Sequence, residues 1–140
     1  MKIFIDENLS PFLARGIHIL EKNLDDGFEV LSIKDVFGKK DEFGKNDGKG
    51  VKDEEWIPQV GKMNGVVITQ DKNIHRTKLQ RDLFQKHGIG MFFISPPKNG
   101  YTYWQMVEIL IKEWKDIKEK CSTKKPFSFI HRPRSGFKKW

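Results

Sequence analysis

Two short apolar runs that each lead into an aspartate constrain this chain more than any other feature. Residues 3–5 (IFI) precede Asp6, and residues 66–70 (VVITQ) precede Asp71. Runs of this length, rich in β-branched and aromatic residues, are typical of strands buried on both faces. In an open parallel sheet, ligands bind at the carboxyl ends of strands, where the strand order reverses. We therefore expect Asp6 and Asp71 to face each other across one crevice, where a divalent cation would keep both ionised.

Strand-like and helix-like segments alternate along the chain. Ser10 followed by Pro11 is a typical helix start. The helix predicted over residues 11–24 has apolar residues at helical spacing: Leu13, Ile17, Leu20 and Leu24. The pattern then predicts a strand over 28–33, a helix beginning at Asp53, a helix over 78–86, a strand over 91–94 and a helix over 103–120. The buried stripe expected on the last helix is Met106, Val107, Leu110, Ile111, Trp114 and Ile117.

This alternation predicts an α/β fold in one domain. The sheet is expected to be doubly wound, mostly parallel and four- to five-stranded, with order 2-1-3-4 and helices on both faces. In that order the reversal lies between the first and third strands, which are the strands that lead into Asp6 and Asp71. We predict a domain over 1–119 with a flexible Gly- and Lys-rich insertion over 38–50, followed by a basic aromatic tail over 120–140.

Composition excludes several classes of protein and site. The single cysteine, Cys121, excludes an intramolecular disulfide and a thiolate zinc cluster. No apolar stretch is long enough for a membrane span, and no signal peptide is visible. We expect a cytoplasmic protein that does not associate with membranes.

The net charge of +7 comes from the tail, whose seven Lys and Arg residues are accompanied by no acid. A basic segment of this kind attracts a polyanion, and the predicted nucleic-acid-binding residues here are Lys124, Lys125, Arg132 and Arg134. The tail aromatics Phe127, Phe129, Phe137 and Trp140 could stack on unpaired bases. The alternative is that residues 127–130 form an edge strand and the lysines are ordinary surface.

The expected crevice is acidic. Asp6, Asp71 and one carboxylate from residues 53–55 are candidate ligands for Mg²⁺ or Mn²⁺, which prefer oxygen donors. Asn8 and Asn73 can add amide oxygens, because alternate residues of an extended segment face the same side. Asp53 has a second interpretation as the N-cap of its helix.

Three ordered motifs resemble a known family. Residues 6–11 (DENLSP), 53–58 (DEEWIP) and 67–74 (VITQDKNI) resemble the compact PIN-like domains, in the branch grouped with VapC-type toxins of toxin–antitoxin modules. The resemblance implies a Mg²⁺- or Mn²⁺-dependent ribonuclease whose acids are Asp6, Glu55 (or Asp53) and Asp71. Asn73 stands where the family commonly has a fourth aspartate, which weakens a second metal position.

The resemblance also implies a mechanism and partners. Asp6 and Asp71 would hold a metal that activates water and polarises the phosphate, and Glu55 would hold a second metal or orient the water. Lys72, His75 and Arg76 follow the third acid and would bind phosphate or stabilise the transition state. The implied partners are an RNA substrate, a cognate antitoxin and a second copy of the chain in a homodimer.

Two other functions remain open on the sequence. Asn73 and the basic tail favour a catalytically weak PIN-like module that binds RNA or a protein. A phosphoreceiver domain also has aspartates after its first and third strands, and Lys98 could serve as its lysine. However, a receiver needs five strand–helix units and has no use for the acid at the start of the helix near residue 53.

Overall fold

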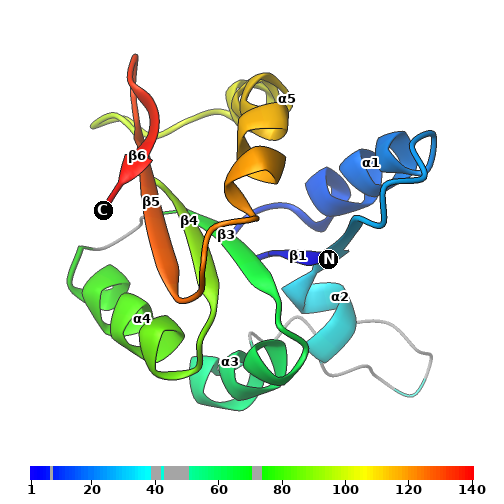
Figure 1. Cartoon of the computed structure of the whole chain (residues 1–140). Coiled ribbons are helices and arrows are strands. Elements are labelled where there is room, and N and C mark those ends of the chain that lie inside the picture. The colour runs from blue at the N-terminus through cyan, green and yellow to red at the C-terminus, as the bar shows by residue number, and fades with distance from the viewer. Residues whose placement is uncertain (7, 39–41, 43–50, 71–73) are drawn as a thin grey trace.

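The computed structural model describes residues 1–6, 8–38, 42, 51–70 and 74–140, and for residues 74–76 it describes only the backbone. Within these residues, six strands form one sheet with helices on both faces (Figure 1). The strands are β1 (Lys2–Ile5), β2 (Glu29–Ser32), β3 (Val66–Gln70), β4 (Gly90–Ile94), β5 (Phe127–Arg132) and β6 (Gly136–Lys139). The predicted Gly- and Lys-rich insertion falls almost entirely outside the described residues.

The strand order is β2-β1-β3-β4-β5-β6, and every pairing is parallel except that of β6 with β5. The predicted order 2-1-3-4, with its reversal between β1 and β3, is confirmed. The sheet has one strand more than the upper prediction, because residues of the tail form both β5 and β6. Residues 127–130 do form a strand, as one interpretation predicted, but its expected place at the edge is wrong, since β5 pairs with β4 on one side and with β6 on the other.

The described helices are α1 (Pro11–Glu21), α2 (Ile33–Phe37), α3 (Asp53–Lys62), α4 (Ile74–Lys86) and α5 (Tyr103–Lys120). Ser10 caps α1 by accepting a hydrogen bond from the Phe12 amide, as its position before Pro11 predicts. The bounds of α5 match the prediction, and Thr102 and Gln105 form a capping box at its start. α1 ends three residues earlier than predicted, α4 begins four residues earlier, and α2 was not predicted.

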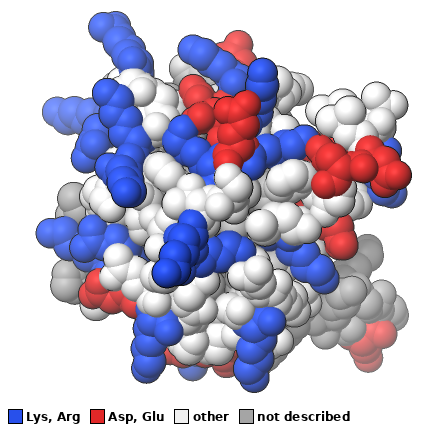
Figure 2. Space-filling view, viewed as in Figure 1, with Lys and Arg blue, Asp and Glu red and all other residues white. Residues whose placement is uncertain are grey.

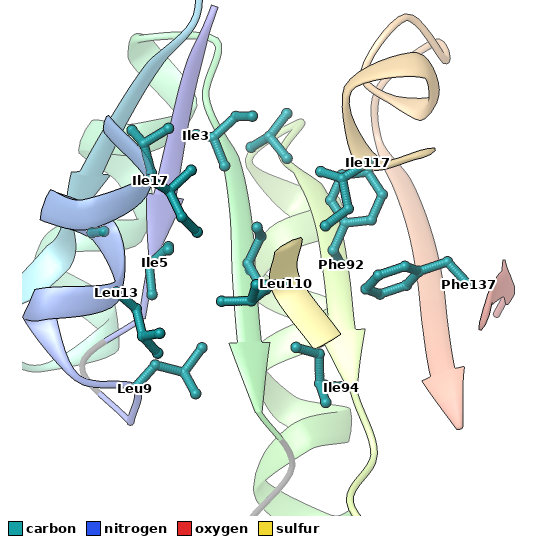
Figure 3. Packing of buried hydrophobic residues seen from close by; sticks show 14 of the residues in the cluster. Ile3, Ile5, Leu9, Leu13, Ile17, Phe92, Ile94, Leu110, Ile117 and Phe137 are labelled. Atoms are coloured by element: carbon teal, nitrogen blue, oxygen red, sulfur yellow. The ribbon is translucent and has the colours of Figure 1, made fainter. Parts of the chain in front are cut away.

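Two apolar clusters cover the two faces of the sheet. On one face, α1 and α5 pack on alternate residues of the strands, including Ile5, Ile68 and Phe92 (Figure 3). On the other face, α3 and α4 supply Trp56 and Phe84, which pack with Phe4 and Met91 among others. Continuous apolar strands such as β4 are therefore buried from both sides, as their sequence predicts.

Part of the predicted helix stripes is not buried. Leu20, Leu24 and Ile111 are 62%, 53% and 56% exposed, because α1 and α5 each pack on the sheet without closing over each other at this point. Leu20 and Ile111, together with Phe12, Trp104 and their neighbours, line an apolar groove of about 310 Å³ between the two helices. Leu24 lines an adjoining groove of about 210 Å³. No helix in the described part of the chain has the length and apolar content that crossing a membrane requires.

The five parallel strands, β1 to β5, end at the same side of the sheet, which we call the carboxyl edge. In chain order these strands end at Ile5, Ser32, Gln70, Ile94 and Arg132. Because α3 and α4 alternate with parallel strands, each of them begins at the carboxyl edge and ends at the opposite, amino edge. The residue after β1 and the first residues of α3 and α4 therefore lie at the edge where the acidic crevice is predicted.

Candidate active site

Asp6 is a buried carboxylate at the end of β1. Asp6 is an acidic residue and lies at the carboxyl edge, yet it is only 1% exposed. Its backbone amide donates to the carbonyl of Ile68 at 3.0 Å, and its carbonyl accepts from the Leu9 amide at 3.0 Å. The first bond continues the β1–β3 ladder past the last residue of β1, and the second closes a turn after Asp6, so both backbone groups of Asp6 are held by hydrogen bonds.

Thr69 holds the Asp6 side chain from the neighbouring strand. Its Oγ1 donates to Asp6 Oδ2 at 2.6 Å, and both residues are buried. A carboxylate that accepts a hydrogen bond in a buried position is oriented more strictly than one in water. Thr69, the next-to-last residue of β3, therefore positions the Asp6 carboxylate.

Asp53 lies at the start of α3, where it contacts α4. Lys52 occupies the N-cap position and Asp53 is the first helical residue, so the interpretation of Asp53 as the helix cap is wrong. Its half-buried side chain instead accepts a hydrogen bond from Gln80 Nε2 at 3.3 Å. This contact joins the first turn of α3 to α4, the helix that follows β3.

Gln80 is a residue that sequence reasoning missed. It is 4% exposed and follows the buried Thr77 by three residues, with the buried Phe84 four residues further on. Two polar residues on the buried face of a helix are a signal for tertiary hydrogen bonds, because unpaired polar groups in a core are costly. That spacing would have identified Gln80, although it would not have named Asp53 as its partner.

Glu55, the other predicted helix acid, has an exposed side chain. Residues two apart on a helix point in nearly opposite directions, so Asp53 and Glu55 cannot both face α4. The structure places Asp53 in contact with α4 and leaves Glu55 in solvent.

Several predicted site residues lie outside the described residues. These are Asp71, Lys72 and Asn73, which follow the end of β3 at Gln70 and precede the start of α4 at Ile74. His75 and Arg76 belong to the first turn of α4, whose backbone lies at the carboxyl edge, but their side chains are also outside the description.

The four predicted basic residues of the tail fall into two groups. Arg132 and Arg134 lie at the carboxyl edge, at the end of β5 and in the turn that leads to β6, and both are exposed. Lys124 and Lys125 precede β5 and therefore lie at the amino edge, where Lys125 donates to the carbonyl and side-chain oxygens of Asn64. Figure 2 shows Lys and Arg side chains gathered over the part of the molecule where Figure 1 places the β5–β6 hairpin.

The tail aromatics are not available for bases to stack on. Phe127, Phe129 and Phe137 are 6–8% exposed and pack around Phe92. The half-buried Trp140 stacks on Phe93 at 5.2 Å between ring centroids, and the Arg81 guanidinium lies 4.3 Å from its ring centroid. The prediction that these rings stack on nucleobases is corrected: β5 and β6 use them as core.

The side chains at the carboxyl edge can be compared with the ligands that a metal ion requires. In the part of the chain that is described, no group of three His, Cys, Asp or Glu side chains is placed to hold a metal ion. Chain topology puts Asp6, at the end of β1, and Asp53, at the start of α3, at the carboxyl edge, and the third predicted ligand, Asp71, follows β3 outside the described residues. Carboxylates without histidine or thiolate suit a hard cation such as Mg²⁺, which keeps several waters when one or two carboxylates bind it.

Comparison with protein families decides what kind of domain this is. A family model described as a PIN-like domain matches residues 1–96, which is more than half of the chain. The chain belongs to the PIN-like domain family. Searches of curated proteins and of solved structures found no match. PIN-like domains are a superfamily of nucleases that generally use divalent metals.

The family match ends between β4 and α5. Asp6, Asp53, Thr69 and Gln80 all belong to the matched part, which ends at residue 96. α5, β5 and β6 follow it, so the PIN-like domain of this chain has a sheet that continues beyond the matched region.

Proposed function

We propose that the chain is a metal-dependent ribonuclease that hydrolyses RNA phosphodiesters at the carboxyl edge of its sheet. The observation that supports this most directly is the Asp6 carboxylate, which is 1% exposed and oriented by Thr69 at 2.6 Å. A buried carboxylate is costly unless it is paired or coordinates a cation. Its place, at the reversal of strand order, is where open α/β sheets bind their ligands.

The proposed roles follow from where the side chains lie. Asp6 and Asp71 are the proposed metal ligands, and Asp53 is the acid of α3 that faces the same elements, in preference to the exposed Glu55. When bound, a divalent cation supplies Lewis acidity toward a phosphate oxygen and lowers the pKa of a water. Thr69 and Gln80 are positioning residues, because they hold Asp6 and Asp53 rather than touching the substrate.

Phosphate binding is assigned to basic groups at the same edge. The first turn of α4 contains His75 and Arg76, and the N-terminal end of a helix favours anions through the helix dipole. Arg132 and Arg134 approach the edge from β5. Lys124 and Lys125 are assigned no role in the reaction, because they lie at the amino edge.

The proposed activity is tested with a mixed panel of RNAs. The wild-type protein is expected to cleave in Mn²⁺ or Mg²⁺, to stop cleaving when EDTA is added, and to recover when the metal is restored in excess. Cleavage that continues in EDTA would contradict the metal dependence. RNA that stays intact with folded protein and metal present would favour the binding module, with Asn73 as the residue to restore to aspartate.

The proposed biological setting is the toxin of a toxin–antitoxin module, which rests on the resemblance of the three motifs. It predicts that expression of the chain arrests growth, that Asp6→Asn relieves the arrest, and that a co-expressed inhibitor protein relieves it by covering the acidic crevice. Growth that is unaffected by expression of an RNA-cleaving wild-type protein would contradict the toxin role and leave the nuclease intact.

A further inference from the structure

A polar cleft lies at the carboxyl edge, between α5 and the turn that joins β5 to β6. Its volume is about 370 Å³, and its walls include Tyr101, Lys112 and Glu113 on one side and His131 and Arg134 on the other. All of these residues follow residue 96, so the cleft is built by the part of the chain outside the family match.

The cleft contains a buried polar group with an unused hydrogen-bonding atom. His131 is 6% exposed, and its ring packs against Phe137 at 5.1 Å between centroids. Its Nε2 lies 3.6 Å from Glu113 Oε1, whereas its Nδ1 has no hydrogen-bond partner among the described residues. Buried polar atoms of folded proteins are nearly always paired, so an unpaired one that lines a cleft suggests a ligand.

Carboxylates line the cleft, and basic side chains lie at its rim. Glu113 is partly buried inside it, and Glu108 also lines it, so the interior disfavours a phosphate. Lys112 and Arg134 are exposed at the rim, and neither forms an ion pair with any described residue. A neutral group with hydrogen-bond donors and acceptors suits the interior, and an anion suits the rim.

A nucleotide has these two parts in one molecule. Its base presents N–H donors that a carboxylate accepts and ring nitrogens that pair with an imidazole, and its π-face can stack on an aromatic ring such as that of the half-buried Tyr101. Its phosphate matches the guanidinium of Arg134.

The cleft lies at the same edge of the sheet as the proposed active site. His131 pairs with Ile94 in the sheet, and β3 lies between β4 and the strand that leads into Asp6. Three strand spacings separate Asp6 from His131, or about 14 Å along the edge. Asp6 lies on the same face of the sheet as Phe4, whereas His131 lies on the face of Phe129, so an RNA strand that reaches both residues crosses over the carboxyl edge.

We propose that this cleft is a nucleotide subsite, in which a base of single-stranded RNA enters between α5 and the hairpin while its phosphate contacts Arg134. The proposal rests on the proposed ribonuclease function for its choice of RNA. The subsite would hold the strand a few nucleotides from the phosphodiester that is cleaved.

The test measures binding separately from cleavage. A fluorescent single-stranded 12-nucleotide RNA is titrated with the full chain in EDTA, and the Kd is read from anisotropy. Arg134→Glu is expected to raise Kd at least about fivefold, and Tyr101→Leu to raise it as well. Lys138→Glu, which makes the same charge change on an exposed residue of β6, is the matched control and is expected to change Kd less than about twofold.

Every outcome separates the subsite from the nuclease. Equal weakening by Arg134→Glu and Lys138→Glu would mean general charge attraction and would overturn the subsite, as would an unchanged Kd for Arg134→Glu or no binding at all. If Arg134→Glu weakens binding selectively while the wild-type protein cleaves nothing in Mn²⁺, the subsite stands and the nuclease fails. If the wild-type protein cleaves RNA while Arg134→Glu binds RNA normally, the nuclease stands and the subsite fails.

Discussion

Thr69 Oγ1 donates a hydrogen bond to Asp6 Oδ2 at 2.6 Å, and this contact joins two strands whose residues are 63 positions apart in the chain. Both groups are buried, so the bond lies in a low-dielectric environment where an unpaired partner is costly. It places the Asp6 carboxylate at the reversal of strand order, and the proposed chemistry depends on that placement.

Replacing Thr69 by Val removes the donor while keeping the side-chain shape. We expect Thr69→Val to lower the free energy of unfolding by about 1–3 kcal/mol, because a buried carboxylate loses this donor. RNA cleavage should fall with it, and Thr69→Ser should restore both. Urea unfolding followed by circular dichroism measures the first effect. A Val variant as stable and as active as the wild-type protein would show that the bond has no role.

The two acids of α3 can be separated by isosteric amides. Asp53→Asn is expected to reduce cleavage roughly tenfold or more while the protein stays folded, because Asn keeps an oxygen for Gln80 but loses the charge that a cation needs. Glu55→Gln changes an exposed side chain and is expected to leave the rate within about twofold. The opposite ranking in a single-turnover cleavage assay would assign the helix acid to Glu55.

Trp140 is expected to stabilise the fold without taking part in the reaction. Its ring stacks on Phe93 and lies against the Arg81 guanidinium. Trp140→Ala should therefore lower the free energy of unfolding by about 1–3 kcal/mol, with a smaller loss for Trp140→Phe. RNA affinity, measured under conditions where the variant is folded, should stay near that of the wild-type protein. A large loss of affinity with unchanged stability would instead support a base-stacking role.

His131 gives the stability of the chain a pH dependence of known sign. Burial lowers the pKa of His131 below its usual value of 6.5, Lys112 acts in the same direction, and the Glu113 carboxylate opposes both. The unfolded chain therefore binds a proton at a pH where the folded chain does not, so stability is full above about pH 6.5 and falls as the pH is lowered below it.

This dependence is isolated by comparing two proteins. The loss of unfolding free energy between pH 7.5 and pH 5.5 is expected to be larger for the wild-type protein than for His131→Gln, because the carboxylates that do not contact residue 131 contribute equally to both. Urea titrations at the two pH values give the comparison. Identical losses would show that His131 titrates alike in the folded and unfolded chains.

The central part of the fold was predictable because the strands are short, apolar and separated by helix signals. The runs at residues 3–5 and 66–70 predicted β1 and β3, and the alternation of segments predicted the order around them. That order is what places Asp6 at the switch point. These features depend on local pattern and on general rules of chain connection, so no distant contact had to be guessed.

The tail was harder to predict because its pattern fits two interpretations. Aromatic residues at alternating positions suit a strand as well as a base-binding surface, and only the pairing of β5 with β4 decides between them. The split of Lys124 and Lys125 from Arg132 and Arg134 follows from the same fact, since a strand places its two ends at opposite edges of the sheet.

The role of Asp53 depended on whether α3 begins at this residue or one residue later. At the N-cap its side chain would bond to its own helix, whereas at the first helical position it is free to reach α4. Sequence alone places helix ends only to within one or two residues. The spacing of Gln80 from Thr77 and Phe84 marks it as a buried polar residue, but a bond between two helices leaves no local sign that Asp53 is its partner.

The most direct test of a metal-dependent nuclease at the carboxyl edge is the rate of RNA cleavage by Asp6→Asn in Mn²⁺. The matched control is Glu29→Gln, which neutralises an exposed carboxylate at the start of β2, on the opposite edge. Asp6→Asn is expected to fold and to cleave roughly 100-fold or more slowly than the wild-type protein, while Glu29→Gln cleaves at the wild-type rate. A folded Asp6→Asn that cleaves as fast as Glu29→Gln would contradict the account.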